Sequence, residues 1–336
     1  MTAGAAAVTS LPSAAHSQIY PTRPVRLLVG FPPGGGSDVG ARIIANRLSE
    51  LWGQQVIVEN KPGAGGHLAI DVAAHASHDG YTMIWVGGSI PLYGLMIKSI
   101  NYDPEADLTP VTLVGTYPNI LAVPNASPWQ SVRYMIATAK ANPGAVTFSS
   151  PGVGTSPHLT GVLFARLAGI DIRHVPYRGG GPALTDLIAA RVDCMFNTAG
   201  TLLTAIRAGQ VRGLAVTSAK RFATAPELPT IAESGVPDLD VTSWYALYMP
   251  ANSPSPLVQK VSQDASEILN EPAVKAKYEQ LGILSGGSTP AELAERGRSE
   301  ATLAIGHGGG RHSAGIAESR HRLVGITVYN SGALPS

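Results

Sequence analysis

The sequence predicts an α/β protein with largely parallel sheets, because short apolar runs alternate with helical patterns and glycine-rich turns connect several of them. The β-branched and apolar runs predict strands over residues 25–29, 55–59, 81–86, 146–149, 172–175, 194–196 and 211–217. The patterns between them predict helices over residues 38–51, 66–76, 131–141, 156–167, 182–190 and 202–208.

The length of the chain suits two domains better than one. It has 336 residues, of which 44% are hydrophobic and 14% charged, so it can bury a full core. Residues 120–124 and 241–250 are extended, end in proline and flank the middle third, which favours a pair of crossover strands. We then expect one lobe over 20–124 plus 248–300 and a second over 125–247, hinged to close around a ligand. The alternative is one large sheet with long loops.

Composition excludes several classes of protein. The net charge is +1 and Lys/Arg runs are absent from the sequence, which argues against nucleic acid or an anionic membrane as the main partner. Apolar runs stay shorter than a membrane-spanning helix, so membrane insertion is not expected. The single cysteine, Cys194, rules out an intrachain disulfide. His75, His78 and Asp79 lack a convincing further ligand nearby, so we predict no metal site.

Both ends of the chain have an unusual amino-acid composition. Residues 1–19 are rich in Ala, Ser and Thr and end like a secretory signal, but lack its basic start and strong apolar centre. We interpret them as an incomplete signal sequence, with a disordered tail as the alternative. Glycines at 306 and 308–310 stand where an amphipathic terminal helix would be expected, so residues 301–336 are predicted to be an atypical tail, either disordered or the product of an altered reading of the gene's end.

The stretch from Phe31 to Asp38 is the strongest functional signal. It follows an apolar strand and opens a helix, so its unpaired backbone N–H groups and the helix dipole suit a carboxylate or phosphate. The alternative is a tight turn in which the glycines are needed only because the backbone adopts positive φ. A dinucleotide fingerprint needs a glycine where Val39 stands, so we predict no nucleotide cofactor.

Two more glycine-containing turns, over residues 149–156 and 177–183, also connect a predicted strand to a predicted helix. In open α/β sheets ligands bind beyond the carboxyl ends of the strands, where all three turns are expected to lie. Three helix N-termini then converge on a small anion. The candidate ligand-binding residues are Phe31, Gly34, Gly35, Asp38, Ser150, Thr155, Ser156, Tyr177, Gly179 and Ala183.

Individual roles remain open at this level. Asp38 is acidic, so we assign it to capping and loop organisation, with a water-mediated or amine contact as the alternative. The hydroxyls of Thr155 and Ser156 either donate to the ligand or cap the helix. Tyr177 either lines the cleft or packs in the core. Arg178 either pairs with a ligand carboxylate or with an acidic side chain on the surface.

Ordered motifs along the chain resemble the Bug family of periplasmic solute receptors, the receptor component of tripartite tricarboxylate transporters. They run over residues 20 to about 295 in matching order and spacing: Tyr20-Pro21-x-Arg23-Pro24, Phe31-Pro32-Pro33-Gly34-Gly35-x-x-Asp38, Val58-Glu59-Asn60-Lys61-Pro62-Gly63-Ala64-Gly65-Gly66, Asp79-Gly80-Tyr81-Thr82, Ser150-x-Gly152-x-Gly154-Thr155-Ser156-x-His158-Leu159, Pro176-Tyr177-Arg178-Gly179-x-x-Pro182-Ala183 and Leu228-Pro229-Thr230-Ile231-Ala232-Glu233-Ser234-Gly235.

The resemblance implies a type II periplasmic binding protein fold, with two α/β lobes, two crossover strands and a ligand cleft between them. It further implies a monomeric, nonenzymatic receptor that captures a small carboxylated solute, through main-chain groups and ordered water, for membrane transporter subunits. The solute classes are di- and tricarboxylates, acidic amino acids and aromatic acids. The alternatives are a partner that presents ligand to a sensor kinase and, less favoured because the sequence has no Gly-x-Ser-x-Gly elbow, an α/β enzyme.

Overall fold

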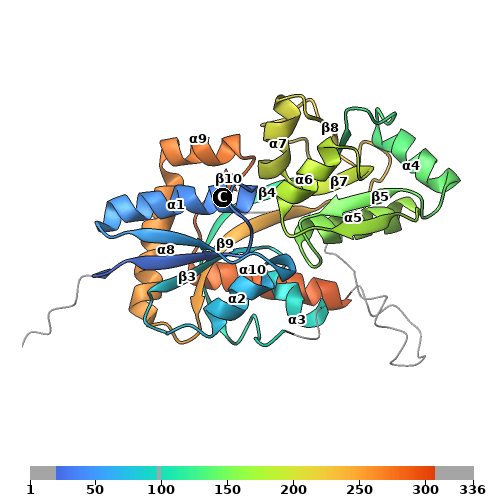
Figure 1. The fold of residues 1–336 in the computed structure, drawn as a ribbon. Helices are drawn as coiled ribbons and strands as arrows, with labels where there is room; N and C mark the ends of the chain where they lie inside the picture. Colours follow the sequence, from blue (N-terminus) through green and yellow to red (C-terminus); the bar gives the residue numbers. More distant parts are fainter. Residues whose placement is uncertain (1–19, 97–99, 307–336) are drawn as a thin grey trace, which may run out of the picture.

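The computed structural model describes residues 20–96 and 100–306, which form two α/β lobes joined by two crossover strands (Figure 1). The signal-like segment and residues 307–336 lie outside the described residues. In the first lobe, β1 (Val25–Val29), β2 (Val56–Asn60) and β3 (Thr82–Gly87) pair in parallel in the order β2-β1-β3. The crossover strand β9 (Thr242–Pro250) pairs antiparallel with β3, and β4 (Leu108–Pro124) follows it. The two-residue strand β10 (Leu284–Ser285) is antiparallel to β4.

The second lobe repeats this topology. Its strands are β5 (Thr147–Ser150), β6 (Arg173–Pro176), β7 (Cys194–Thr198) and β8 (Val211–Val216). β6, β5 and β7 are parallel neighbours, β4 is antiparallel to β7, and β8 pairs with the other edge of β4. Each lobe therefore has three parallel strands followed by one antiparallel strand that arrives from the other lobe; β4 and β10 then complete the first sheet, and β8 completes the second.

Strand β4 is longer than the segment predicted at 120–124. Its residues 108–118 pair with β9, whereas residues 119–124 pair with β7 and β8. Pro110 and Pro118 obscure the first part in the sequence, because proline argues against a central strand. The register shifts next to Pro110, which is how the strand accommodates a residue without an N–H.

Helices cover both faces of each sheet (Figure 1). In the first lobe, one core cluster is formed with α1 (Gly36–Trp52), α8 (Ser255–Asn270) and α9 (Pro272–Gln280). A second core cluster is formed with α2 (His67–Ala74), α3 (Tyr93–Met96) and α10 (Pro290–Gly306). In the second lobe α4 (Val132–Ala141) and α5 (Ser156–Ala168) lie on one face and α6 (Gly180–Ile188) and α7 (Ala199–Arg207) on the other. Short 3-10 turns η1 (Ala64–Gly66) and η2 (Ile90–Leu92) complete the first lobe.

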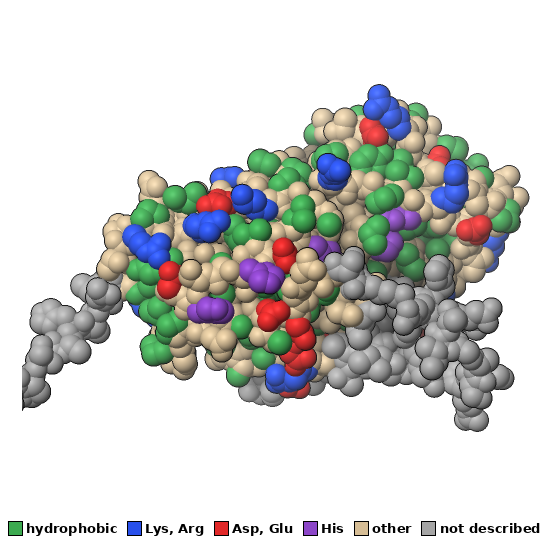
Figure 2. All heavy atoms as spheres, turned by 60° about the horizontal axis from the view of Figure 1, so that its bottom comes forward, with side chains coloured by type: hydrophobic (Ala, Val, Ile, Leu, Met, Phe, Trp, Pro, Cys, Tyr) green, Lys and Arg blue, Asp and Glu red, His purple; other side chains and the backbone are tan. Residues whose placement is uncertain are grey.

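Helices α8, α9 and α10 were not among the predicted elements. Helix α10 begins at a capping box, in which the Glu292 amide donates to Thr289 Oγ1 and the Glu292 carboxylate accepts from the Thr289 amide. It ends at Gly306, so residues 301–306 are helical. Nowhere in residues 20–96 and 100–306 does a helix combine the length and hydropathy that crossing a membrane requires. On the face shown in Figure 2, basic and acidic side chains are interspersed.

Candidate functional site

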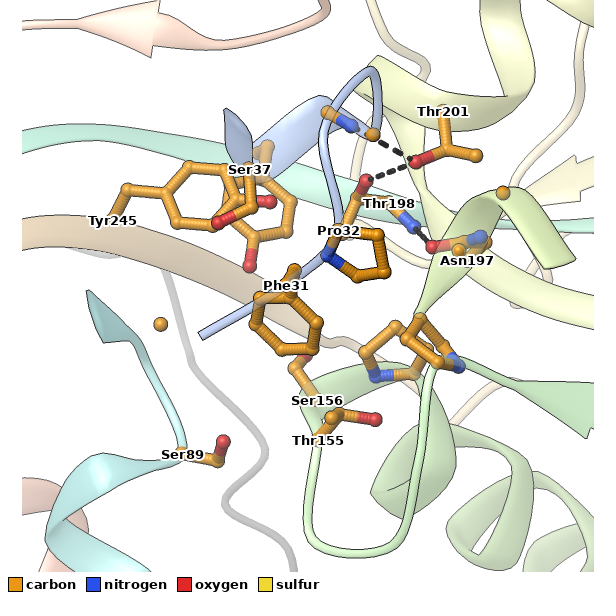
Figure 3. A pocket seen from close by; sticks show the side chains of 18 of the residues that line it. Phe31, Pro32, Ser37, Ser89, Thr155, Ser156, Asn197, Thr198, Thr201 and Tyr245 are labelled. Atoms are coloured by element: carbon orange, nitrogen blue, oxygen red, sulfur yellow. Dashed lines mark hydrogen bonds between the residues drawn. The ribbon is translucent and has the colours of Figure 1, made fainter. Parts of the chain in front are cut away.

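A pocket lies between the two lobes, beside the crossover strands (Figure 3). It contains about 650 Å³ of space outside the protein atoms, part of it open to solvent. The residues lining it are Phe31, Pro32, Pro33, Gly35, Gly36, Ser37, Gly87, Ser89, Tyr93, Tyr117, Pro151, Thr155, Ser156, Pro157, Gly180, Gly181, Pro182, Asn197, Thr198, Thr201 and Tyr245. None of these described lining residues is charged, so an anion bound here is compensated by neutral dipoles.

Four helices start at this pocket: α1, α5, α6 and α7. Their N-cap residues are Gly35, Thr155, Gly179 and Thr198, and the N-cap side chain caps none of the four helices. The first turn of a helix has N–H groups without intrahelical acceptors and carries partial positive charge. The pocket therefore presents backbone donors and positive dipole ends from both lobes, which is chemistry suited to a carboxylate.

Asp38 organises the first glycine loop and does not line the pocket. Its carboxylate is buried and accepts hydrogen bonds from the Gly34 amide at 2.9 Å, from Arg42 Nε at 3.0 Å and from Asn60 Nδ2 at 2.8 Å. Burial opposes ionisation, but these hydrogen bonds outweigh it and hold the pKa of Asp38 below its usual value. Asn60 also donates to the Phe31 carbonyl at 2.8 Å, so one acidic group and one amide fix the turn that carries Phe31 and Gly35.

Ser156 and Thr155 both line the pocket, and neither uses its hydroxyl as a helix cap. Ser156 Oγ accepts a hydrogen bond from Asn119 Nδ2 at 2.9 Å, so its own proton is available to a ligand. Thr155 Oγ1 donates to the Gly152 carbonyl at 2.7 Å and thereby closes the turn before α5. The capping alternative for these two residues is wrong, because the hydroxyls have other partners.

Ser150 supports this loop from behind. It is fully buried, and its Oγ lies 2.7 Å from His174 Nε2. His158 Nδ1 accepts a hydrogen bond from the Gly154 amide at 3.2 Å, and the rings of His158 and His174 pack at a tilt of 38° with centroids 4.2 Å apart. Burial lowers the pKa of His158 and, together with the charge of His158, lowers that of His174 to about 4. His174 is therefore neutral at pH 7, and both imidazoles act as packing and hydrogen-bonding supports.

The third predicted loop contributes backbone more than side chains. Tyr177 donates its phenol to Asp186 Oδ2 at 2.7 Å and is absent from the pocket lining. Ala183 lies on the buried face of α6, and Arg178 is exposed and outside the lining. The groups of this loop that face the pocket are Gly180, Gly181 and Pro182. Of the ten predicted residues, Phe31, Gly35, Thr155 and Ser156 line the pocket, whereas Gly34, Asp38, Ser150, Tyr177, Gly179 and Ala183 are not among its lining residues.

A fourth strand-to-helix turn was missed by the sequence reasoning. β7 ends at Asn197 and Thr198, and α7 begins at once with no glycine-rich loop between them. Asn197, Thr198 and Thr201 line the pocket from this turn. The signal present in the sequence was the run Asn197-Thr198-Ala199-Gly200-Thr201 directly after an apolar strand, which has the same polar character as the other three turns.

Aromatic residues from the crossover strands form one wall of the pocket. Tyr117 on β4 and Tyr245 on β9 stack with ring centroids 4.4 Å apart, and Trp85 packs against Tyr245 at 4.9 Å. Burial raises the pKa of Tyr245 to about 12, so its phenol is protonated and can donate a hydrogen bond. This wall gives the pocket an apolar surface beside its polar ends.

Glycines let the loops of the two lobes touch at the rim. A Cβ on Gly65 of the first lobe would stand 2.4 Å from the Val153 carbonyl oxygen of the second. A Cβ on Gly179 would stand 2.6 Å from Pro32 Cδ. Both glycines also have positive φ, of 66° and 125°, which disfavours any other residue. The lobes are therefore in contact around the pocket in this structure.

Two lobes of the same topology, linked by two crossover strands with a pocket between them, define a periplasmic binding protein of type II. Residues 40–285 match the tripartite tricarboxylate transporter family receptors, so the chain belongs to this family, known also as the Bug family. The predicted fold class and the resemblance to the Bug family are both confirmed.

Relatives and solved structures agree with this assignment. The chain is 38% identical over 296 residues to a UPF0065 protein encoded between tcbD and tcbE in Pseudomonas sp. strain P51, covering 88% of each chain. It is 36% identical over 291 residues to BugT of Bordetella pertussis, covering 86% of this chain and 87% of BugT.

Among solved structures, Rpa4515 of R. palustris with adipate has 32% identity and a TM-score of 0.83, covering 91% of this chain and 99% of that one. MatC of Rhodopseudomonas palustris with bound malate has 29% identity and a TM-score of 0.80, covering 84% and 98%.

Proposed function

We propose that this chain is a periplasmic receptor that closes on a small carboxylated solute and delivers it to the membrane subunits of a tripartite tricarboxylate transporter. The observation that carries the proposal is the pocket itself, where four helix N-termini from two lobes, none capped by the side chain of its own N-cap residue, surround a space with no charged lining residue among those described. Two related receptors are described with adipate and with malate, which supports a carboxylate as the ligand.

The pocket's chemistry suits a solute with a carboxylate end and an apolar or hydroxylated body. Phe31, Pro32, Pro151, Tyr117 and Tyr245 provide apolar contact, while hydroxyls and amides supply donors. No described group of three or more His, Cys, Asp or Glu side chains is placed to hold a metal ion, so the proposal uses no metal. The proposed solutes are di- and tricarboxylates, acidic amino acids and aromatic acids.

The test is a thermal-unfolding screen of the purified chain against these acids, each paired with its uncharged amide. An acid present at a hundred times its dissociation constant is expected to stabilise the fold by about 2.7 kcal/mol, and its amide by much less. The proposal fails if a correctly folded sample is stabilised by none of the acids. Capture of transporter subunits, rather than of a sensor kinase, from solubilised membranes by the acid-loaded chain tests the delivery step.

A further inference from the structure

A second cavity lies within the first lobe and shares no described lining residue with the pocket between the lobes. It holds about 1250 Å³ of space outside the protein atoms, part of it open to solvent, compared with about 650 Å³ in that pocket. The cavity is bounded by η2, the loop before β4, strands β4 and β9, and helix α10, on the face of the sheet where α3 and α10 lie in Figure 1. The proposed receptor function makes no use of it.

The floor and walls of this cavity are apolar. Tyr248 on β9 pairs with Pro110 on β4, and Leu108 lies two residues before Pro110 on the same face of the sheet. A Cβ on Gly297 of α10 would stand 3.6 Å from Pro91 Cγ, so α10 and η2 are in contact at one side of the cavity. The cavity therefore offers an apolar ligand body a place between the sheet and α10.

The phenol of Tyr248 is a buried polar group on this floor. Tyr248 is 6% exposed, and its hydroxyl has no hydrogen-bond partner within residues 20–96 and 100–306. Burial and, to a smaller extent, the charge of Glu300 raise the pKa of Tyr248 above its usual value, so the phenol keeps its proton at pH 7. It can then donate one hydrogen bond and accept another. Buried phenols normally have a polar partner, so this one indicates a polar group on the body of a ligand.

The rim of the cavity is acidic. Its charged lining residues among those described are Asp103, Glu105 and Arg298, and all three are exposed. Arg298 Nη2 pairs with Glu295 Oε2 at 2.7 Å, and Glu295 is not in the lining, so the positive charge is already compensated. Asp103 Oδ1 accepts a hydrogen bond from the Glu105 amide at 2.9 Å, which fixes the turn that carries both carboxylates. The rim therefore attracts a cation and repels the carboxylates expected between the lobes.

We propose that this cavity is a second ligand-binding site, which takes a small organic ammonium ion whose apolar body carries a hydroxyl. The ammonium lies against Asp103 and Glu105, the body packs on Leu108 and Pro110, and its hydroxyl bonds to Tyr248. Recognition uses all three features together, because exposed carboxylates by themselves hold a cation weakly and an apolar cavity by itself does not select for charge. The site acts independently of solute capture between the lobes.

Tyramine has each of these groups and serves as the probe. Phenethylamine lacks the hydroxyl, and tyrosol carries a hydroxyl in place of the ammonium, so the two compounds separate the two polar contacts. Binding to the purified full chain is measured by ligand-observed NMR titration. We expect tyramine to bind saturably, and phenethylamine and tyrosol each to bind about fivefold more weakly, as the loss of one hydrogen bond or one exposed ion pair predicts. Added salt is expected to weaken the binding of tyramine and to leave that of tyrosol unchanged.

Two charge reversals locate the probe on the protein. Glu105→Lys replaces a rim carboxylate by an ammonium, so we expect the affinity for tyramine to fall roughly tenfold or more. Glu227 is an exposed residue of the second lobe outside the cavity lining, and Glu227→Lys, the matched control, is expected to leave the affinity unchanged. Ala294→Trp narrows the cavity from α10 and is expected to abolish binding.

Tyr248→Phe tests the buried hydroxyl. In this variant tyramine and phenethylamine are expected to bind equally, whereas Tyr134→Phe, at an exposed tyrosine of α4, is expected to preserve the fivefold difference. Thermal unfolding checks that each variant folds. Because Glu105 and Glu227 are exposed, the charge reversals test the site even if a variant at position 248 or 294 does not fold.

The site is wrong if the folded wild type shows no saturable binding of tyramine, or if Glu105→Lys and Glu227→Lys bind tyramine within twofold of each other. An undiminished preference for tyramine over phenethylamine in a folded Tyr248→Phe variant would also contradict it. These results are independent of whether the chain binds an organic acid between its lobes, so they leave the receptor function untouched.

Discussion

Serine and threonine N-cap residues use their hydroxyls differently at the pocket and away from it. Away from the pocket, Ser131 Oγ accepts the Tyr134 amide at the start of α4 and Thr289 Oγ1 accepts the Glu292 amide at the start of α10. At the pocket, the Thr155 hydroxyl donates to the Gly152 carbonyl, and the Thr198 hydroxyl lies 3.3 Å from Thr201 Oγ1. At the pocket, therefore, these two N-cap side chains leave the first-turn amides of α5 and α7 without a side-chain cap, whereas Ser131 and Thr289 cap their helices.

The largest expected effect is a loss of affinity for the acid when a negative charge is placed at the start of a pocket helix. In Ser156→Asp the carboxylate stands at the start of α5 inside an otherwise uncharged pocket. Two like charges about 4 Å apart cost about 4 kcal/mol at a partly exposed site, so we expect affinity for the acid to fall on the order of a thousandfold.

Ser131→Asp is the matched control, because aspartate caps a helix as well as serine does. Calorimetric titration is expected to show unchanged affinity for this variant. Equal losses in the two variants would mean that the charge acts on the whole protein and not at the pocket.

Gly36→Ala tests the contact between the starts of α1 and α7. The added methyl group would meet Gly200 and Thr201 at 3.2 Å, which is tight enough to push the lobes apart. Overpacking of this kind costs typically 1–3 kcal/mol, and here it acts on the closed state, so we expect about a tenfold loss of affinity with little change in the thermal stability of the unliganded protein. Gly286→Ala, which has open space around it, serves as the control. Unchanged affinity in Gly36→Ala would show that the lobes do not approach this closely when ligand binds.

Asp38→Asn tests the support behind the first loop. The variant loses the ionic contacts with Arg42 and the charge-assisted bond from the Gly34 amide, so we expect a loss of about 1.5–3 kcal/mol in the free energy of unfolding at pH 7. Because the pKa of Asp38 is lowered in the folded state, the stabilisation is present above the unfolded pKa of about 4 and is lost as pH falls through the folded value. The difference between wild type and variant, followed by urea unfolding, should therefore shrink below about pH 4. A difference that is independent of pH would contradict the role of the ionised carboxylate.

The smallest expected effect is that of Ser131→Ala. Removing this cap is expected to lower the free energy of unfolding by about 1 kcal/mol and to leave acid binding unchanged. Urea unfolding and titration of the same preparation measure both. A change in affinity would mean that the distant cap and the pocket are not independent.

The regular part of the fold was predictable from the sequence, because the strands predicted at residues 25–29 and 211–217 coincide with β1 and β8 within a residue. The long strand β4 was not, since Pro110 and Pro118 mask it. Three of the four helix starts at the pocket were predicted because their turns are rich in glycine. The α7 turn carries its signal in Asn197, whose significance depends on which end of its amide is already bonded, and that is known only once Thr198 is placed.

Side-chain roles were the least predictable part of the site. Ser150, Tyr177 and Asp38 have the residue types of ligand contacts, yet their polar atoms are engaged by His174, Asp186 and Arg42 respectively. Sequence patterns identify the loops, whereas the hydrogen bonds that use up a hydroxyl or carboxylate come from residues distant in the chain.

A crystal structure of the chain with the acid that stabilises it most is the most direct test of anion binding by neutral helix starts. We predict that carboxylate oxygens lie within hydrogen-bonding distance, directly or through one water, of first-turn amides in both lobes. An acid held instead by an arginine or lysine side chain, or bound outside the space between the lobes, would contradict the account.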